Sequence, residues 1–147
     1  MPGAKKALIL FSIIFSTAIY AQGEAGGISG TTVTMREIAP VWPGCEGVSL
    51  GERDACFKKK LISHITKNYK YPPAELKNNV QGVVKITFVV NKKGLIDVVS
   101  LSGGNKGLQA EAKRNIMLIP KMAEPGQLGG EPHPIEYTVP FTFKSGR

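Results

Sequence analysis

The strongest constraint on the fold is a stretch of alternating apolar and polar residues, followed by a turn and a second apolar stretch. Every second residue is apolar at Val84, Ile86, Phe88 and Val90. This period of two is typical of a β-strand with one buried face. In the turn over residues 91–94, Gly94 supplies the positive φ angle that such loops need, and residues 95–101 return as a second strand. The sequence therefore predicts a β-hairpin that begins at Gln81.

An amphipathic helix is predicted before the hairpin. Its apolar residues recur at helical spacing, at Phe57, Leu61, Ile62, Ile65 and Tyr69. Asp54 is the expected N-cap. The helix must end by Tyr71, because Pro72 and Pro73 disfavour helical geometry in the residue before them. A short second helix over residues 73–79 then begins with proline in its first turn, where the missing N–H is not needed.

A third helix is predicted after the hairpin. Residues 102–105 break the second strand. One face of the following helix is apolar, at Leu108, Ala112, Ile116 and Ile119. Glu111 and Arg114 lie off that face, so Glu111 is expected to be a surface charge rather than an acid catalyst. Pro120 closes the helix, and residues 124–134 form a polar loop.

A last strand over residues 135–144 completes an α+β domain. Its apolar side chains point one way, at Ile135, Tyr137, Val139, Phe141 and Phe143. The order of elements predicts a small three-stranded antiparallel sheet packed by two or three helices. Pro140 lacks the N–H of a sheet ladder, so this strand is expected at an edge of the sheet, where another chain can add itself.

The N-terminus is expected to be a secretory signal peptide over residues 1–21. Two lysines precede a short apolar run, and small residues lead to Ala21. The alternative is an uncleaved membrane anchor, although the apolar run is shorter than the roughly 20 residues that span a bilayer. Either a signal peptide or a membrane anchor would place the rest of the chain outside the cytoplasm, in the periplasm. Residues 22–53 are expected to be a flexible and extended lead-in, and residues 54–147 a folded domain.

Two cysteines fit that location. Cys45 and Cys56 are 11 residues apart, and in an oxidising compartment such a pair most simply forms a disulfide. A zinc site would need about four ligands at short spacings, and a redox dithiol would need a Cys-x-x-Cys motif. The two histidines, His64 and His133, are far apart in the sequence. A structural disulfide is therefore expected, with no metal and no cofactor.

Charge and motifs argue against two other classes of protein. The net charge of +8 could suit an acidic protein, anionic lipid or nucleic acid. However, the basic residues do not alternate with aromatic ones, and the one run of three, at residues 58–60, begins a helix, so nucleic-acid binding is not expected. No Gly-x-Ser-x-Gly, His-Glu-x-x-His or phosphate-loop motif is present, so the chain is not expected to be an enzyme.

Residues from about 71 to 144 resemble the TonB C-terminal domain family. The landmarks are, in order, Tyr71-Pro72, Gly82 at the start of the first strand, Gly94 in the turn, Glu111-Ala112, Ile119-Pro120-Lys121, Pro125-Gly126 and Val139-Pro140-Phe141-Thr142-Phe143. Each landmark alone is weakly specific, whereas the set in this order and spacing is typical of the family. The segment around Pro43-Gly44-Cys45-Glu46 also resembles the part that precedes this domain in related envelope proteins.

The resemblance implies a function. TonB transmits energy from a proton-driven motor of the inner membrane to outer-membrane receptors, and its C-terminal domain grips a receptor segment, the TonB box, as an added strand. Carried over to this chain, the strand edge would contribute Ile135, Glu136, Tyr137, Thr138, Val139 and Thr142. The segment before the hairpin would touch the receptor plug through Asn68, Tyr69, Lys70 and Tyr71. Tyr71 is equally expected to pack against the sheet.

The chain departs from a full energy transducer in its spacer. About 50 residues separate Gln22 from Tyr71, and at 3.3–3.6 Å per residue even a stretched chain would be marginal for crossing the periplasm. The expected function is a TonB-like protein-binding module that pairs with TonB-dependent outer-membrane receptors in energy-coupled transport, with contact to the inner-membrane motor proteins as its stronger form. The alternative is a secreted structural module that self-associates, for example as a homodimer, through the same edge.

Overall fold

The computed structural model describes residues 35–146. The signal peptide expected over residues 1–21, and the part of the lead-in that precedes residue 35, lie outside these residues. Within residues 35–146, the structure contains no helix with the length and apolar character needed to cross a membrane.

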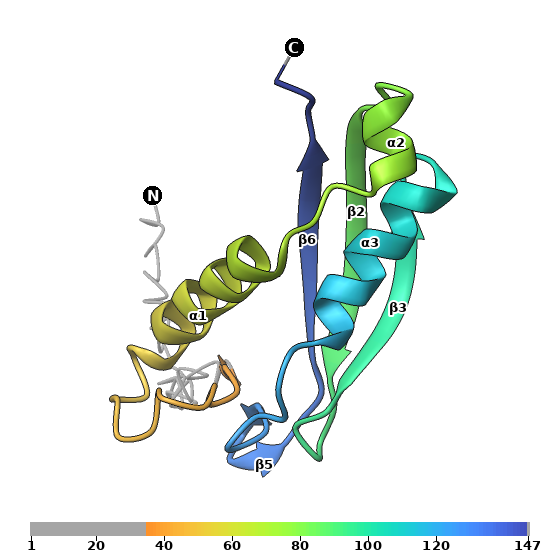
Figure 1. The fold of residues 1–147 in the computed structure, drawn as a ribbon. Helices are drawn as coiled ribbons and strands as arrows, with labels where there is room; N and C mark the ends of the chain where they lie inside the picture. The colour runs from red at the N-terminus through yellow and green to blue at the C-terminus, as the bar shows by residue number, and fades with distance from the viewer. Residues whose placement is uncertain (1–34, 147) are drawn as a thin grey trace, which may run out of the picture. The chain divides into compact units, whose positions relative to one another are not determined.

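The main sheet contains three antiparallel strands, β2 (Gly82–Val90), β3 (Ile96–Ser102) and β6 (Ile135–Phe143). Their order is β3-β2-β6, so β2 lies in the centre. Figure 1 shows α3 (Lys106–Met117) across this sheet, α1 (Arg53–Asn68) beside β6, and α2 (Pro73–Lys77) near one end. Alternate residues of β2 are buried under the helices, as the period of two predicted. The predicted α+β fold is confirmed.

Two connections follow the predicted turn chemistry. Gly94 has a φ of +77°, and its carbonyl accepts a hydrogen bond from the Met122 backbone N–H at 2.9 Å. Gly94 therefore closes the hairpin and also ties it to the segment after α3. In the break before α3, the Asn105 side chain accepts a hydrogen bond from the Leu108 backbone N–H at 2.9 Å, which caps the helix.

A second, smaller sheet was not predicted. It contains β1 (Glu37–Ile38), β4 (Gln127–Leu128) and β5 (Glu131–Pro132), in the order β1-β4-β5. Residues 124–134 are therefore not a simple polar loop, and the prediction is corrected there. Each strand has only two residues, which is too short to give a periodic signal. Gly129 and Gly130, with φ angles of +60° and +85°, form the turn between β4 and β5.

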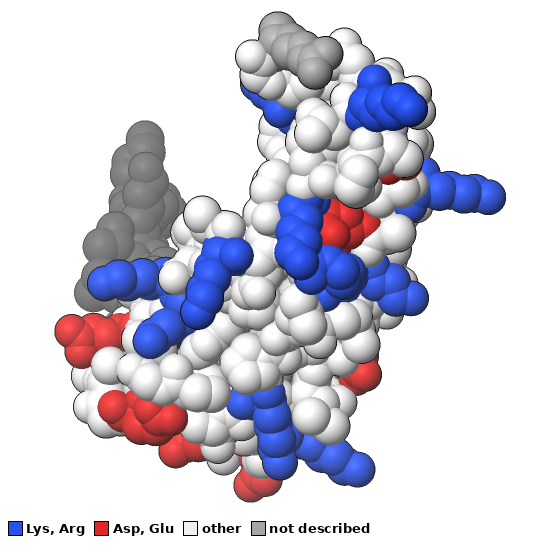
Figure 2. All heavy atoms as spheres, viewed as in Figure 1, with Lys and Arg blue, Asp and Glu red and all other residues white. Residues whose placement is uncertain are grey.

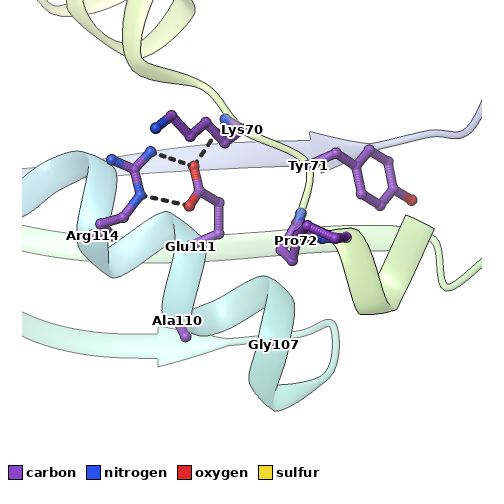
Figure 3. Close-up of a pocket in the computed structure, with 8 residues that line it drawn as sticks. Lys70, Tyr71, Pro72, Gly107, Ala110, Glu111 and Arg114 are labelled. Carbon is purple, nitrogen blue, oxygen red and sulfur yellow. Dashed lines mark hydrogen bonds and ion pairs between the residues drawn. The ribbon is translucent and has the colours of Figure 1, made fainter. Parts of the chain in front are cut away.

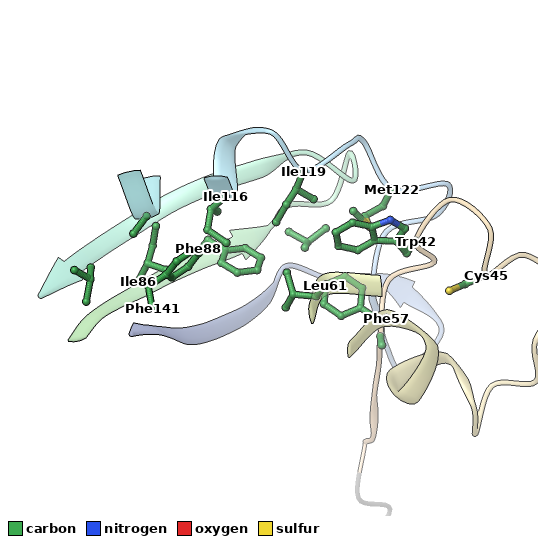
Figure 4. Close-up of a cluster of buried hydrophobic side chains, with 14 of the residues drawn as sticks. Trp42, Cys45, Phe57, Leu61, Ile86, Phe88, Ile116, Ile119, Met122 and Phe141 are labelled. Atoms are coloured by element: carbon green, nitrogen blue, oxygen red, sulfur yellow. The ribbon is translucent and has the colours of Figure 1, made fainter. Parts of the chain in front are cut away.

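The core joins the sheet, the helices and the segment before α1. Figure 4 shows aromatic and aliphatic side chains of β2, α1 and α3 packed together with Trp42. Trp42 lies edge-on to Phe57 of α1, with ring centroids 5.5 Å apart, and both are buried. The predicted disulfide is confirmed, since Cys45 and Cys56 are bonded. The bond joins this segment to α1, and Cys45 itself lies in the core.

Three details of the helices correct the sequence prediction. Asp54 is not the N-cap of α1, because the helix begins at Arg53 and Glu52 occupies the N-cap position, two residues earlier than predicted. Ile62 does not extend the buried face, because its side chain is 64% exposed. α2 ends at Lys77 rather than at Asn79, which adopts a positive φ of 52°.

Candidate functional site

One side of β6 has no partner strand within the described part of the chain. β6 pairs with β2 in an unbroken antiparallel register, from Ile135 opposite Val90 to Phe143 opposite Gly82. Its other side is unpaired, because the sheet ends there in the order β3-β2-β6. The prediction that Pro140 marks an edge strand is therefore confirmed.

The unpaired side of β6 presents the backbone groups of every second residue. The Tyr69 hydroxyl donates a hydrogen bond to the Thr142 carbonyl at 3.4 Å, so this carbonyl points away from β2. Backbone groups alternate in direction along a strand, and Pro140 therefore has its missing N–H on the same side, where the β2 ladder loses no bond. By the same alternation, the N–H and C=O groups of Glu136 and Thr138 face outward. We call this unpaired side the β6 edge, residues 136–142.

The side chains of β6 divide between two faces of the sheet. Glu136, Thr138 and Thr142 are exposed on the face without helices, and the Thr138 hydroxyl is 2.9 Å from that of Thr87. Tyr137 and Val139 are half-buried on the helix-covered face. The six residues of the predicted edge set on β6 therefore share a strand but not a face.

Tyr137 joins β6 to α1. Its ring stacks on Phe57 with centroids 4.4 Å apart and lies 5.6 Å from Phe88. Burial raises the pKa of the Tyr137 hydroxyl well above its ordinary value, and the negative charges of Asp54 and Glu37 raise it further. The ring is thus held as a neutral, packed group rather than as a free contact residue.

The predicted plug-contacting segment lies at the end of α1, next to the β6 edge. Tyr69 stacks on Phe143 with ring centroids 5.3 Å apart, and burial raises the pKa of its hydroxyl. Tyr71 meets Phe143 edge-on at 5.6 Å, and its hydroxyl donates to the Val80 carbonyl at 2.6 Å. Both tyrosines therefore pack against the sheet, while Lys70 between them is exposed.

The prediction that Glu111 is a surface charge is wrong. Its side chain is 8% exposed and accepts hydrogen bonds from the Lys70 backbone N–H at 2.9 Å and from Arg114 Nε at 2.7 Å (Figure 3). Arg114 also donates to the Asn68 carbonyl at 2.6 Å, and its hydrogen bond with Glu111 raises the pKa of its guanidinium. This pair, the Glu111–Arg114 clamp, fastens residues 68–70 to α3. The helical pattern could not reveal it, because the buried position depends on where that segment crosses α3.

An open hollow lies between the clamped segment and α3. Its volume is about 780 Å³, and its lining residues are Lys70, Tyr71, Pro72, Pro73, Gly107, Ala110, Glu111 and Arg114. Its one carboxylate, that of Glu111, already accepts bonds from Lys70 and Arg114. Among residues 35–146, no cluster of three or more His, Cys, Asp or Glu side chains could hold a metal ion. The hollow is therefore a surface groove.

Basic residues are spread over the helical face. Figure 2 shows Lys and Arg side chains at separate places on this face rather than in one patch. Within the run at residues 58–60, Lys58 is paired with Asp54 at 2.7 Å. On this face of residues 35–146, the distribution gives no continuous basic track of the kind that binds a nucleic-acid backbone.

The family model for the C-terminal part of the Gram-negative bacterial TonB protein matches residues 67–145. The chain belongs to the TonB C-terminal family. Two solved chains of the Helicobacter pylori TonB C-terminal domain are also similar. One is 20% identical over 69% of this chain and 88% of that chain, with a TM-score of 0.43. The other is 22% identical over 60% and 92%, with a TM-score of 0.38. No curated protein matches significantly.

Membership of the TonB C-terminal family gives the chain a TonB-like role in the bacterial envelope, and domains of this family are protein-interaction modules. The family match contains the whole main sheet with α2 and α3, but only the last residues of α1. Most of α1 and the disulfide-tied segment before it precede the match. The β6 edge thus belongs to the TonB part of the chain, whereas the helix beside it belongs mainly to an N-terminal extension.

Proposed function

We propose that this TonB C-terminal domain binds extended segments of other proteins by strand addition to the β6 edge. The partner is the TonB box of a TonB-dependent outer-membrane receptor, and the binding serves energy-coupled transport. The observation that carries the proposal is that β6 is paired on one side only, along all of its length. Strand addition draws affinity from main-chain hydrogen bonds, and the outward groups of Glu136 and Thr138 can supply them.

The segment before the hairpin supplies a second contact in this proposal. Asn68, Tyr69 and Tyr71 are half-buried, whereas Lys70 is exposed. The clamp fixes the Lys70 backbone on α3 through Glu111, and the neighbouring Tyr69 contacts the β6 edge at Thr142, so the exposed Lys70 side chain extends from a fixed point near that edge. Lys70 is therefore the residue of this segment best suited to meet an acidic group on the receptor plug.

The wider setting is also part of the proposal. Residues 1–21 export the chain to the periplasm, and residues 22–53 lead to the domain of residues 54–147, with Trp42 and Cys45 of the lead-in packed into its core. Coupling to inner-membrane motor proteins is the stronger form of this function. The alternative is a structural module in which the β6 edges of two copies pair with each other, since an unpaired edge is open to its own kind as well.

A titration with a synthetic TonB-box peptide tests the proposal. Backbone amide resonances of Glu136, Thr138 and Thr142 should shift in NMR spectra, and those of β3 should not. Sedimentation of the free chain tests the alternative, which requires a dimer that the peptide dissociates. If the chain is monomeric and no amide of the β6 edge responds to any receptor peptide, strand addition to receptors is excluded.

A further inference from the structure

Two hollows flank the β6 edge on its helical side. One has a volume of about 330 Å³ and is lined by Ile65, Thr66, Tyr69, Pro140, Phe141 and Thr142. The other, of similar volume, is lined in part by Asp54 and Lys58 of α1 and by Ile135, Glu136 and Tyr137 of β6. α1 therefore runs beside the β6 edge and leaves open space at both ends of it.

Helical geometry places Ile62 between these hollows. Lys58, Ile62 and Thr66 are four residues apart, so they form one stripe along α1. Lys58 lines one hollow and Thr66 lines the other, and the stripe therefore borders β6 along its length. Ile62 is 64% exposed, so this stripe presents a large apolar side chain that no residue of the described chain covers fully.

We infer that the β6 edge and this stripe of α1 form the two walls of a docking groove. The α1 wall selects partner segments in which apolar and polar residues alternate. The inference rests on the proposed strand addition and names the chemistry of the segment that is taken. A strand added to β6 would lie about 4.8 Å from it and would send alternate side chains to opposite faces. Those on the helical side meet Ile62 and the half-buried Tyr137 and Val139.

The other side chains of the added strand meet a different surface. On the face without helices, their neighbours are the exposed Glu136 and Thr138. Cross-strand pairs of opposite charge or of hydroxyl groups are favourable, so a basic or hydroxyl residue suits these positions. The occupant of the groove is thus an extended peptide with apolar residues at every second position and with Lys, Arg, Ser or Thr between them.

The wall is supplied by the N-terminal extension, because Ile62 precedes the family match at residues 67–145. The extension is held at β6 by the stack of Phe57 on Tyr137, and the disulfide between Cys45 and Cys56 ties α1 to the segment before it. The TonB part provides the edge that binds any backbone, and α1 adds the discrimination between side chains.

The test compares Ile62→Glu with Val99→Glu, a matched control on β3 whose wild-type side chain is 57% exposed. The probes are a TonB-box peptide with alternating apolar residues and a version in which those residues are aspartate. Ile62→Glu should weaken binding of the apolar peptide by about tenfold, as expected for loss of a central apolar contact. Val99→Glu should leave the affinity unchanged, and the aspartate peptide should bind the wild-type chain more weakly by a similar factor.

Two failures can be told apart by recording amide shifts and affinity on the same samples. If the apolar peptide shifts the amides of Glu136 and Thr138 but binds Ile62→Glu as tightly as the wild-type chain, the wall is overturned while strand addition stands. If no amide of the wild-type chain shifts, strand addition fails and the wall fails with it. Thermal melts of both variants verify folding, which substitution of an exposed side chain should preserve.

Discussion

The two edges of the main sheet differ in how open they are to another strand. At the β3 edge, the register with β2 shifts between Thr87 and Phe88, which leaves Val99 as an extra residue in the strand. At the β6 edge, nine consecutive residues keep one register. A bulge bends and twists a strand and disrupts the spacing of its free groups, which is one way in which proteins protect an edge from pairing.

The difference shows that only one edge of this small sheet, that of β6, has the regular register that favours pairing with another strand. β3 carries the bulge, whereas the register of β6 is regular, and each of the two strands has one exposed acidic residue, Asp97 in β3 and Glu136 in β6. β6 also has α1 beside it, held by the contact between Phe57 and Tyr137. An incoming strand would therefore find an edge without a bulge, next to the exposed Ile62 of α1, only at β6.

The largest expected effect is the loss of peptide binding in Thr138→Pro. Proline removes the outward N–H at the centre of the β6 edge, and its ring crowds the incoming carbonyl. An unpaired buried carbonyl costs about 1–3 kcal/mol, so the affinity should fall by about fivefold to 150-fold, towards the upper end because the ring also clashes. Isothermal titration with the TonB-box peptide measures it.

Two controls accompany that variant. Thr138→Ala removes the hydroxyl contact with Thr87 but keeps the N–H, and should bind almost normally. Val99→Pro places the same ring on the bulge of β3, where proline is tolerated, and should not change the affinity. Equal loss of binding in Val99→Pro and Thr138→Pro would erase the proposed difference between the edges.

The next effect tests the disulfide that supports α1, the helix beside the β6 edge. Reduction of the bond between Cys45 and Cys56 should lower the free energy of unfolding by about 2–3 kcal/mol, because the unfolded chain regains the conformational entropy that the closed loop had removed. Denaturant titration with and without a thiol reductant measures the change. A variant with alanine at both positions should show no response to the reductant. A wild-type chain that is equally stable in both conditions would contradict the prediction.

A smaller effect is expected from Glu111→Ala, which opens the clamp near the β6 edge. The Lys70 N–H and the Arg114 guanidinium would each lose a partner, and we expect destabilisation by about 1–2 kcal/mol. Thermal unfolding measures the loss. Glu111→Gln keeps an acceptor for the Lys70 N–H and should be less affected. A loss as large as in Glu111→Ala would show that charge, rather than hydrogen bonding, holds the segment.

The smallest effect concerns Tyr137 of β6, which has no counterpart in β3. Because burial raises the pKa of its hydroxyl above the ordinary 10.0, the folded state favours the neutral phenol. Its contribution is complete below pH 10 and declines as the pH rises above that value, since the unfolded state ionises first. The free energy of unfolding can be measured between pH 9 and pH 11, about one unit on either side of the ordinary pKa. Over this range it should decline more steeply with pH for the wild-type chain than for Tyr137→Phe. Parallel curves would mean that the ring is not packed against α1.

Periodic features of this chain were predictable from sequence, and features that depend on a single tertiary approach were not. β2 and β6 each have one face that is more exposed to solvent, so the alternation of apolar and polar residues appears directly in the sequence. Pro140 identified the edge strand. By contrast, nothing periodic surrounds Trp42, whose burial depends on the return of α1 across it. Glu111 has the spacing of a surface residue, and only the passage of residues 68–70 over α3 buries it.

The candidate site was predictable at the level of the strand but not of its surroundings. The landmarks of the family indicated β6, and the alternation gave its two faces. The exposure of Ile62 on α1 could not be foreseen, because this residue fits the apolar stripe of the helix and only the packing angle leaves it uncovered. Helix orientation is set by many weak contacts at once, and a sequence pattern does not contain it.

Pro140 has a consequence for how an added strand aligns. A uniform row of peptide groups would accept the same partner at several offsets, each two residues apart, with almost equal energy. The proline interrupts that row near its middle, so each offset leaves a different partner carbonyl without a donor. The edge therefore carries a fixed reference point, because the alignment of a partner decides which of its carbonyls lacks a donor.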